Sequence, residues 1–226
     1  MMNATDSSAK IAEYLLKIKA VKLQPDQPFT WASGWKSPIY CDNRKTLSYP
    51  EIRTYIRDQF IASIQNNFSS SDVIAGVATG GIALGALVAQ EMNLPFVYIR
   101  SEAKKHGLTN MIEGEISSRQ RVVVIEDLIS TGGSSLKAVE ALREKGCIVT
   151  GLIAIFSYGF PMSEVNFHVA SCDFFTLSNY EVLIEEAVRG GYVNESNLET
   201  LKQWRKRSEE HTLNSSHVKR SRMPSS

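Results

Sequence analysis

Two adjacent carboxylates, Glu126 and Asp127, follow the apolar run Arg121–Ile125, and a turn of small residues, 130–134, follows them. Ligands of open α/β sheets bind at the carboxyl ends of strands, which is where this order places both acids. The turn leads into a helical pattern, and backbone N–H groups at a helix N-terminus suit a phosphate dianion. Acids beside a phosphate site fit a sugar phosphate, with the acids facing ribose hydroxyls. The alternative is a capped helix with two solvated acids, but the combination on one strand–turn–helix favours ligand binding.

A second turn rich in glycine, 76–81, joins the apolar run Val73–Val77 to another helical pattern. Its small residues, Thr79 and Gly80 among them, would let the backbone approach a diphosphate closely. Tight packing of helix on strand explains the same glycines, and both interpretations stay open.

Arg100, Lys104 and His106 lie in a polar stretch that runs to Ser118. From the residues alone, a solvated surface loop and a mobile lid that delivers cations to a leaving group are equally supported.

The elements that must position these residues alternate along the chain. Apolar runs at 73–77, 96–99, 121–125 and 147–156 predict buried strands, and helical patterns at 82–92 and 134–145 separate them. Further helical spacing covers 8–21, 49–66, 179–188 and 194–206. Strands that are apolar throughout and alternate with helices predict an α/β fold with a parallel sheet covered on both faces.

Composition narrows the class of protein. The 226 residues are 43% hydrophobic and 22% charged with a net charge of +1, which favours a globular domain and gives no sign of a nucleic-acid or membrane partner. Three cysteines without metal-ligand spacing, and the lack of a long apolar stretch, predict a cytoplasmic location.

Three segments carry a family resemblance. Residues 122–134, VVVIEDLISTGGS, resemble the phosphoribosyl-diphosphate motif of type I phosphoribosyltransferases. Residues 29–44, FTWASGWKSPIYCDNR, resemble the N-terminal hood of the orotate phosphoribosyltransferases, and residues 100–107, RSEAKKHG, resemble their mobile catalytic loop. The similarity of pattern runs from about Ser8 to Arg205.

The resemblance implies a type I phosphoribosyltransferase fold, with a central, mostly parallel sheet flanked by helices and a small N-terminal hood. Residues 1–48 would form the N-terminal helix and hood over the base site, and residues 49–207 the core with its C-terminal helices. Residues 208–226 are Ser-rich and polar without periodicity, which predicts a disordered tail; a vector-derived origin is favoured, and a native flexible tail stays open as the alternative.

The implied reaction transfers 5-phosphoribosyl from 5-phosphoribosyl 1-diphosphate to orotate, giving orotidine 5′-monophosphate and diphosphate. Mg²⁺ would be held mainly through substrate and water, with Asp127 as the candidate direct ligand. A homodimer would share the catalytic loop between subunits. Catalytic roles fall to Lys104, His106, Asp127 and Glu126. Binding of the diphosphate substrate falls to Arg100, Lys104, His106, Glu126, Asp127, Leu128, Ile129, Ser130, Thr131, Gly132, Gly133, Ser134, Thr79 and Gly80. Orotate binding falls to Ser130, Tyr40 and Lys36.

The chain departs from the family pattern at two places. Ala32 stands where some members carry Lys, and residues 155–160 contain no Arg where some members hold the carboxylate of the base. These departures leave open the same chemistry on uracil or a purine. A separate alternative is a non-catalytic regulator that senses phosphoribosyl diphosphate.

Overall fold

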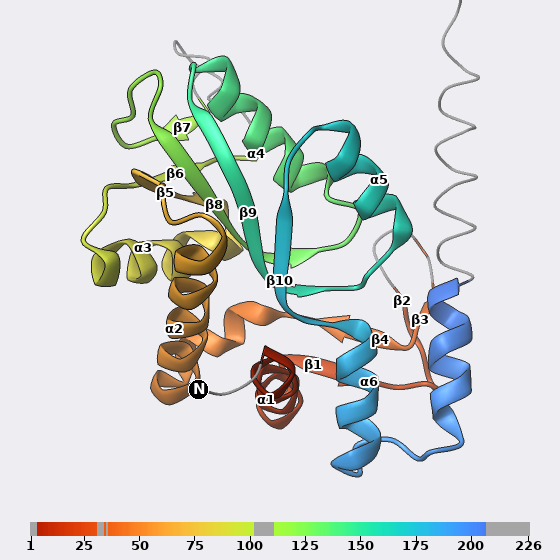
Figure 1. Ribbon diagram of the computed structural model, residues 1–226. Coiled ribbons are helices and arrows are strands. Elements are labelled where there is room, and N and C mark those ends of the chain that lie inside the picture. The colour runs from red at the N-terminus through yellow and green to blue at the C-terminus, as the bar shows by residue number, and fades with distance from the viewer. Residues whose placement is uncertain (1–3, 31–33, 35, 102–110, 207–226) are drawn as a thin grey trace, which may run out of the picture.

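The computed structural model describes residues 4–30, 34, 36–101 and 111–206. A six-stranded sheet in the order β10-β9-β8-β5-β6-β7 forms its centre (Figure 1). All neighbouring pairs are parallel except β6 and β7, which are antiparallel. The strands are β5 (Val73–Val77), β6 (Phe96–Ile99), β7 (Ile112–Glu113), β8 (Arg121–Ile129), β9 (Ile148–Ser157) and β10 (Phe174–Asn179).

Each face of the sheet is buried under its own set of helices. Alternate side chains of a strand point to opposite faces, so Val123 and Ile125 of β8 enter one core while Val122 and Val124 enter the other. The first core is covered by α1 (Ala4–Lys17), α2 (Pro50–Asn67), α3 (Gly80–Met92) and α6 (Tyr180–Arg189). The second is covered by α4 (Gly133–Glu144) and α5 (Pro161–Val169). The predicted α/β class and mostly parallel sheet are confirmed.

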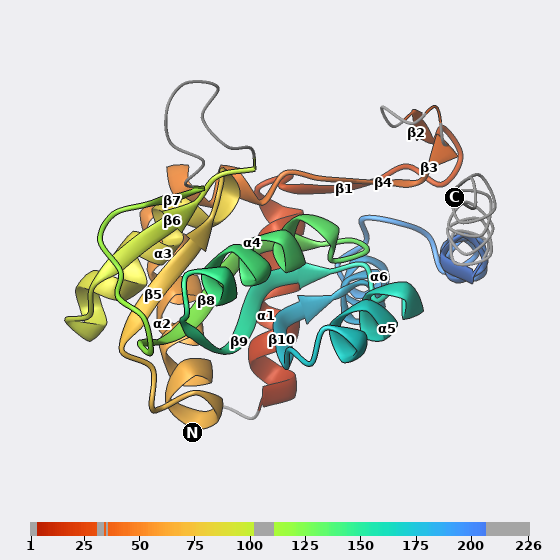
Figure 2. The ribbon, with the colours of Figure 1, turned by 90° about the horizontal axis from the view of Figure 1, so that it is seen from above.

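The described residues of the segment between α1 and α2, residues 21–48, make no pair with the central sheet, and we refer to this segment as the hood. In it β1 (Val21–Leu23) pairs with β4 (Ile39–Cys41), and β2 (Phe29–Thr30) with β3 (Lys36–Ser37), both antiparallel. A 3₁₀ helix, η1 (Asn43–Ser48), leads back to the core. Figure 2 shows β1 and β4 as an arm with β2 and β3 at its far end, close to the helical residues 197–206.

Several predicted boundaries were wrong. The first helix ends at Lys17 instead of Val21, because Val21 pairs with Cys41 as the start of β1. The acid-bearing strand continues to Ile129 instead of ending at Ile125, because β9 pairs with it as far as Ser157. Helix α5 was not predicted at all. Among the described residues, every helix is too short or too polar to cross a membrane.

Candidate functional site

Strands β5 and β8 are neighbours at the point where the sheet reverses its direction of winding. From β5 the chain continues outward through β6 and β7, whereas from β8 it continues the opposite way through β9 and β10. Helix α3 follows β5 and covers one face, and α4 follows β8 and covers the other. The carboxyl ends of two such strands open a crevice that binds ligands in α/β sheets. Both turns singled out in the sequence, 76–81 and 130–134, lie at this edge.

The two adjacent acids of β8 point to opposite faces of the sheet. Glu126 is 4% exposed; its Oε2 accepts a hydrogen bond from Ser135 Oγ of α4 (3.0 Å), and its Oε1 accepts one from the Asp127 backbone N–H (2.9 Å). Burial, with the neighbouring charge of Asp127, raises the pKa of Glu126 to about 8. Glu126 is thus held inside the protein under α4, and its predicted contact with ribose hydroxyls remains a prediction.

Asp127 turns instead toward α3, the helix on the other face. It is half-buried, and a Cβ placed on Gly80 would overlap its carboxyl group. A Cβ on Gly76 would meet the Gly81 carbonyl oxygen at 2.6 Å, so the second turn packs tightly at two of its glycines. Only glycine at position 80 leaves room for the Asp127 carboxylate at the start of α3, where the helix dipole favours an anion.

The loop after β8, residues 130–134, presents its polar groups outward. Ser130 and Ser134 are exposed, and α4 begins at Gly133 without a side chain capping its N-terminus. Gly132 has φ +83°, and a Cβ there would meet the Phe167 ring at 2.6 Å. Asn166 Nδ2 donates to the Thr131 carbonyl (2.8 Å), so α5 fixes the loop from below. Free N–H groups and hydroxyls on a fixed loop suit a phosphate group.

The turn after β5 and the end of β6 complete this edge. Thr79 is exposed, and the Ala78–Thr79 peptide bond is cis. The Ala78 N–H donates to the Ile99 carbonyl (2.8 Å), which joins the turn to β6. Arg100 follows β6; its N–H donates to the Met111 carbonyl (2.8 Å), and its guanidinium pairs with Glu113 at 3.4 Å. Arg100 therefore lies at the end of β6, and β5 separates it from β8, the strand that carries Glu126 and Asp127. Lys104 and His106 lie outside the described residues.

The hood is tied to this edge by Asn43, which is 1% exposed. Asn43 Nδ2 donates to the Asp127 carbonyl at 2.6 Å, and Asn43 Oδ1 accepts from Cys41 Sγ at 3.2 Å. Burial raises the pKa of the Cys41 thiol, so Cys41 keeps the proton that it donates. The bond from Asn43 to the Asp127 carbonyl bridges 84 positions of the chain and holds the start of η1 against β8.

The two hood residues predicted to bind the base lie in different surroundings. Tyr40 is 42% exposed on β4, with its ring 5.7 Å from that of Phe29. Lys36 Nζ donates to Thr30 Oγ1 (2.7 Å) within the β2–β3 hairpin, and its carbonyl accepts from Trp204 Nε1 (3.2 Å). The C-terminal helical residues thus support the hairpin that carries Lys36.

No group of three or more His, Cys, Asp or Glu side chains among the described residues forms a metal cage. The half-buried Asp127 carboxylate, beside a loop suited to phosphate, is one hard oxygen ligand of the kind that Mg²⁺ prefers. This donor set fits an ion that takes its other ligands from substrate and water.

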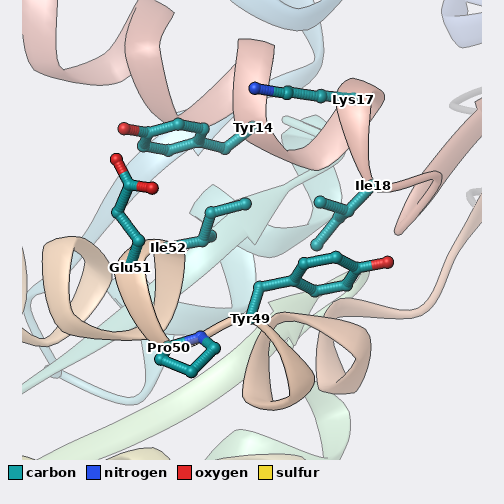
Figure 3. Close-up of a pocket in the computed structure, with 7 residues that line it drawn as sticks. All are labelled: Tyr14, Lys17, Ile18, Tyr49, Pro50, Glu51 and Ile52. Atoms are coloured by element: carbon teal, nitrogen blue, oxygen red, sulfur yellow. The ribbon is translucent and has the colours of Figure 1, made fainter.

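A separate pocket lies between α1 and the start of α2 (Figure 3). Neither acid and no residue of the phosphate-binding loop contributes to it, and it is mostly apolar, so it is not part of the candidate site. It is lined by Tyr14, Lys17, Ile18, Tyr49, Pro50, Glu51 and Ile52.

Three residues that support the site were not predicted from the sequence: Asn43, Ser135 and Asn166. Ser135 directly follows the predicted loop, so its position at the start of a helix was the available signal. Asn43 and Asn166 act over 84 and 35 positions of the chain, and nothing local in the sequence indicates their partners.

Comparison with known proteins shows the family to which this chain belongs. The family model described as a phosphoribosyl transferase domain matches residues 50–186. An orotate phosphoribosyltransferase of Porphyromonas gingivalis is 58% identical over 196 residues, which are 87% of this chain and 93% of the relative.

Two solved structures share the fold. An orotate phosphoribosyltransferase of Aeropyrum pernix superposes with a TM-score of 0.71 at 27% identity, over 81% of this chain and 99% of that one. A UMP synthase of Leishmania donovani gives a TM-score of 0.76 at 24% identity, over 90% of this chain and 43% of that longer one.

Proposed function

Because this chain belongs to the orotate phosphoribosyltransferase family, within the phosphoribosyl transferase domain proteins, we propose that it transfers 5-phosphoribosyl from 5-phosphoribosyl 1-diphosphate to orotate. The products are orotidine 5′-monophosphate and diphosphate, a step of pyrimidine nucleotide synthesis. The observation that carries the proposal is the edge between β5 and β8. There a half-buried carboxylate, Asp127, lies between a glycine turn and an exposed loop of free N–H groups.

In this reaction the bond from ribose C1′ to the diphosphate oxygen breaks, and a bond from C1′ to N1 of orotate forms. The diphosphate leaves with the bonding electron pair, and the N1 proton of orotate is released. Positive charge develops on the ribose ring before the base is fully bonded. An anion beside the ring stabilises that charge most effectively when it is already fixed in place.

We assign the roles by position. Asp127 holds the ribose hydroxyls and stabilises the charged ring, while Glu126, anchored on Ser135, fixes the backbone N–H of Asp127. Residues 130–134 bind the 5′-phosphate, with Ser130 also at the base. Thr79 and Gly80 border the diphosphate. Arg100, with Lys104 and His106 from the loop that follows it, meets the leaving diphosphate, whose charge grows as the bond breaks.

Mg²⁺ is the proposed cofactor, with Asp127 as its protein ligand. When bound, the ion neutralises charge on the diphosphate and makes it a better leaving group. The hood covers the base, with Tyr40 and Lys36 on its strands. We place the enzyme in the cytoplasm, since Cys41, Cys147 and Cys172 are free thiols, as a reducing compartment keeps them.

The substrate test compares bases. Protein, Mg²⁺ and 5-phosphoribosyl 1-diphosphate are mixed with orotate, uracil, hypoxanthine or adenine, and consumption of each base is followed. The specificity constant for orotate should exceed the others by at least ~10²-fold, since a buried site that recognises a carboxylate rejects bases without one. A purine or uracil used as well as orotate would contradict the proposal.

We further propose a homodimer in which each loop completes the site of its partner, because a loop that follows β6 can close over a neighbouring subunit at modest entropic cost. Subunit mixing tests this. Lys104→Ala and Asp127→Asn proteins, each nearly inactive, are dissociated and reassembled together. A loop acting in trans gives one heterodimer site without lesions, and activity returns. Heterodimers that form but stay inactive would contradict the shared site.

A further inference from the structure

Orotate differs from uracil by one carboxylate, and a site that selects orotate must compensate that charge. Neither place where some family members put a cation supplies one here: position 32 is Ala, and residues 155–160 contain no Arg or Lys. The compensating charge must therefore come from elsewhere, and the hood is the element that faces the base in the proposed function.

The hood carries four cations, Lys22, Lys36, Arg44 and Lys45, and the amino groups of two of them are engaged elsewhere. Lys36 Nζ donates to Thr30 Oγ1 at 2.7 Å, at the end of the arm beside Trp204. Lys45 Nζ donates to the Lys19 carbonyl at 3.2 Å, on the side of α1. Arg44 is the residue between Lys45 and the anchor Asn43.

Arg44 is held at the candidate site by the two residues that precede it. Asn43 Nδ2 binds the Asp127 carbonyl at 2.6 Å, which fixes the backbone before Arg44 against the acid-bearing strand. Asp42 Oδ1 accepts from Arg44 Nε at 2.7 Å, which orients the guanidinium from its stem side. Its pKa is raised chiefly by Asp42, with the charges of Asp127 and Tyr40 adding, so both site residues lie within electrostatic reach.

The guanidinium itself remains available. The Arg44 side chain is 57% exposed, and among the described residues only its Nε has a hydrogen-bond partner. The two terminal nitrogens, Nη1 and Nη2, present a planar pair of donors that matches the two oxygens of a carboxylate.

We infer that Arg44 binds the carboxylate of the pyrimidine substrate and so sets the preference of this enzyme for orotate over uracil. This inference rests on the proposed function. Asp42 orients the guanidinium, Asn43 places it at the edge of the site, and Tyr40 lies beside it on β4. Arginine suits this position better than lysine, because a fork of two donors fixes the plane of the ring as well as its charge.

The test replaces Arg44 by Gln and by Lys, with Lys45→Gln as the matched control on the adjacent residue. Steady-state kinetics give the specificity constants for orotate and uracil and the KM for 5-phosphoribosyl 1-diphosphate. Calorimetry gives the Kd of orotidine 5′-monophosphate and of uridine 5′-monophosphate, which lacks the carboxylate. Circular dichroism and the Tm confirm that each variant is folded.

Arg44→Gln should lower the specificity constant for orotate by ~10²-fold, as loss of a charged bidentate contact predicts, and leave the KM for the diphosphate substrate within about 3-fold. The preference for orotidine over uridine monophosphate should shrink by a similar factor. Arg44→Lys should lose about 10-fold, and Lys45→Gln should match the parent protein. A folded Arg44→Gln protein that keeps its full preference for orotate overturns the inference. Failure of the parent protein to use orotate would instead overturn the proposed function.

Discussion

The acid-bearing unit, β8 with its loop and α4, and the hood meet at one edge of the sheet but are held by different kinds of contact. In the first, strand, acids, loop and helix follow each other within residues 121–144, and Glu126 reaches Ser135 only nine positions away. In the hood, strands of two or three residues pair with one another, and the hydrogen bonds that tie the hood to distant parts of the chain include those of Asn43 with Asp127 and of Lys36 with Trp204.

The two regions therefore differ in what they supply: the acid-bearing unit supplies the negative charge of the site, and the hood places the side chains that meet the base. The acid-bearing unit contains a buried carboxylate and a half-buried one, fixed by a rigid strand with neighbours on both sides. The hood contributes aromatic and cationic side chains, and it is placed by a few distant hydrogen bonds and by Val21 and Ile39, whose side chains are buried in the first core. We therefore expect changes in the acid-bearing unit to alter turnover or the pH dependence of the free energy of unfolding, and changes in the hood to alter binding of the base together with a pH-independent part of the stability.

Asp127→Asn should cause the largest effect. The substitution keeps the shape of the side chain and removes the charge beside the developing cation, and turnover with orotate should fall by ~10²–10³-fold. Asp58→Asn, an exposed carboxylate on α2, is the control and should change little. Unchanged turnover with a raised KM would assign Asp127 to binding alone, and would remove the contrast with the hood.

The second expected effect is a pH dependence of the free energy of unfolding that comes from Glu126. Its folded pKa, about 8, lies above the ordinary 4.5, so the folded state binds more protons than the unfolded state between these values. The free energy of unfolding should therefore fall as pH rises from about 5 to about 8, by up to about 1.4 kcal/mol per pH unit. In Glu126→Gln this part of the slope should vanish.

The measurement is urea unfolding at several pH values on both proteins, with Glu140→Gln on the exposed side of α4 as control. The control should keep the slope of the parent protein. An unaltered slope in Glu126→Gln would show that another group titrates, and that the buried acid of β8 is not the source.

Gly80→Ala should reduce turnover by about 10- to 100-fold, since the added Cβ overlaps the Asp127 carboxyl group and one of them must move. If the loss acts through Asp127, adding Gly80→Ala to Asp127→Asn should cost much less than it costs alone. Additive losses would mean that the glycine serves another purpose, such as the approach of the substrate.

Sequence reasoning succeeded where the determinants are contiguous. β5 and β6 have the predicted bounds, Val73–Val77 and Phe96–Ile99, because an apolar run between turn residues is a local signal. The family resemblance on residues 122–134 is confirmed, and the loop lies at the predicted helix N-terminus. The same locality explains why Glu126 and Asp127 were expected to act alike: their order along the chain does not show which face of the strand each one takes.

Reasoning from sequence failed where partners are distant or where pairing overrides a pattern. The helical spacing up to Val21 continues past the true end at Lys17, because strand pairing with Cys41 decides the conformation of Val21. Asn43 gave no signal, since its partner Asp127 becomes a neighbour only in the folded chain. The hood is thus the region whose contacts are least predictable from the sequence.

Asn43→Ser, the smallest expected effect, tests that view of the hood directly. The shorter side chain cannot reach the Asp127 carbonyl, so a partly buried acceptor loses its partner and Cys41 Sγ loses its own. The free energy of unfolding should fall by about 1–2 kcal/mol in urea titrations. Asn67→Ser removes an exposed amide that binds the Ser63 carbonyl within α2, and should cost much less.

Because Asn43 also places Arg44, its loss should raise the KM for orotate several-fold while the KM for 5-phosphoribosyl 1-diphosphate and the turnover stay close to those of the parent protein. A merely structural role would lower stability without favouring one substrate over the other. Equal changes in both KM values, or a fall in turnover as large as that of Asp127→Asn, would show that the hood and the acid-bearing unit act as one element instead of dividing placement from charge.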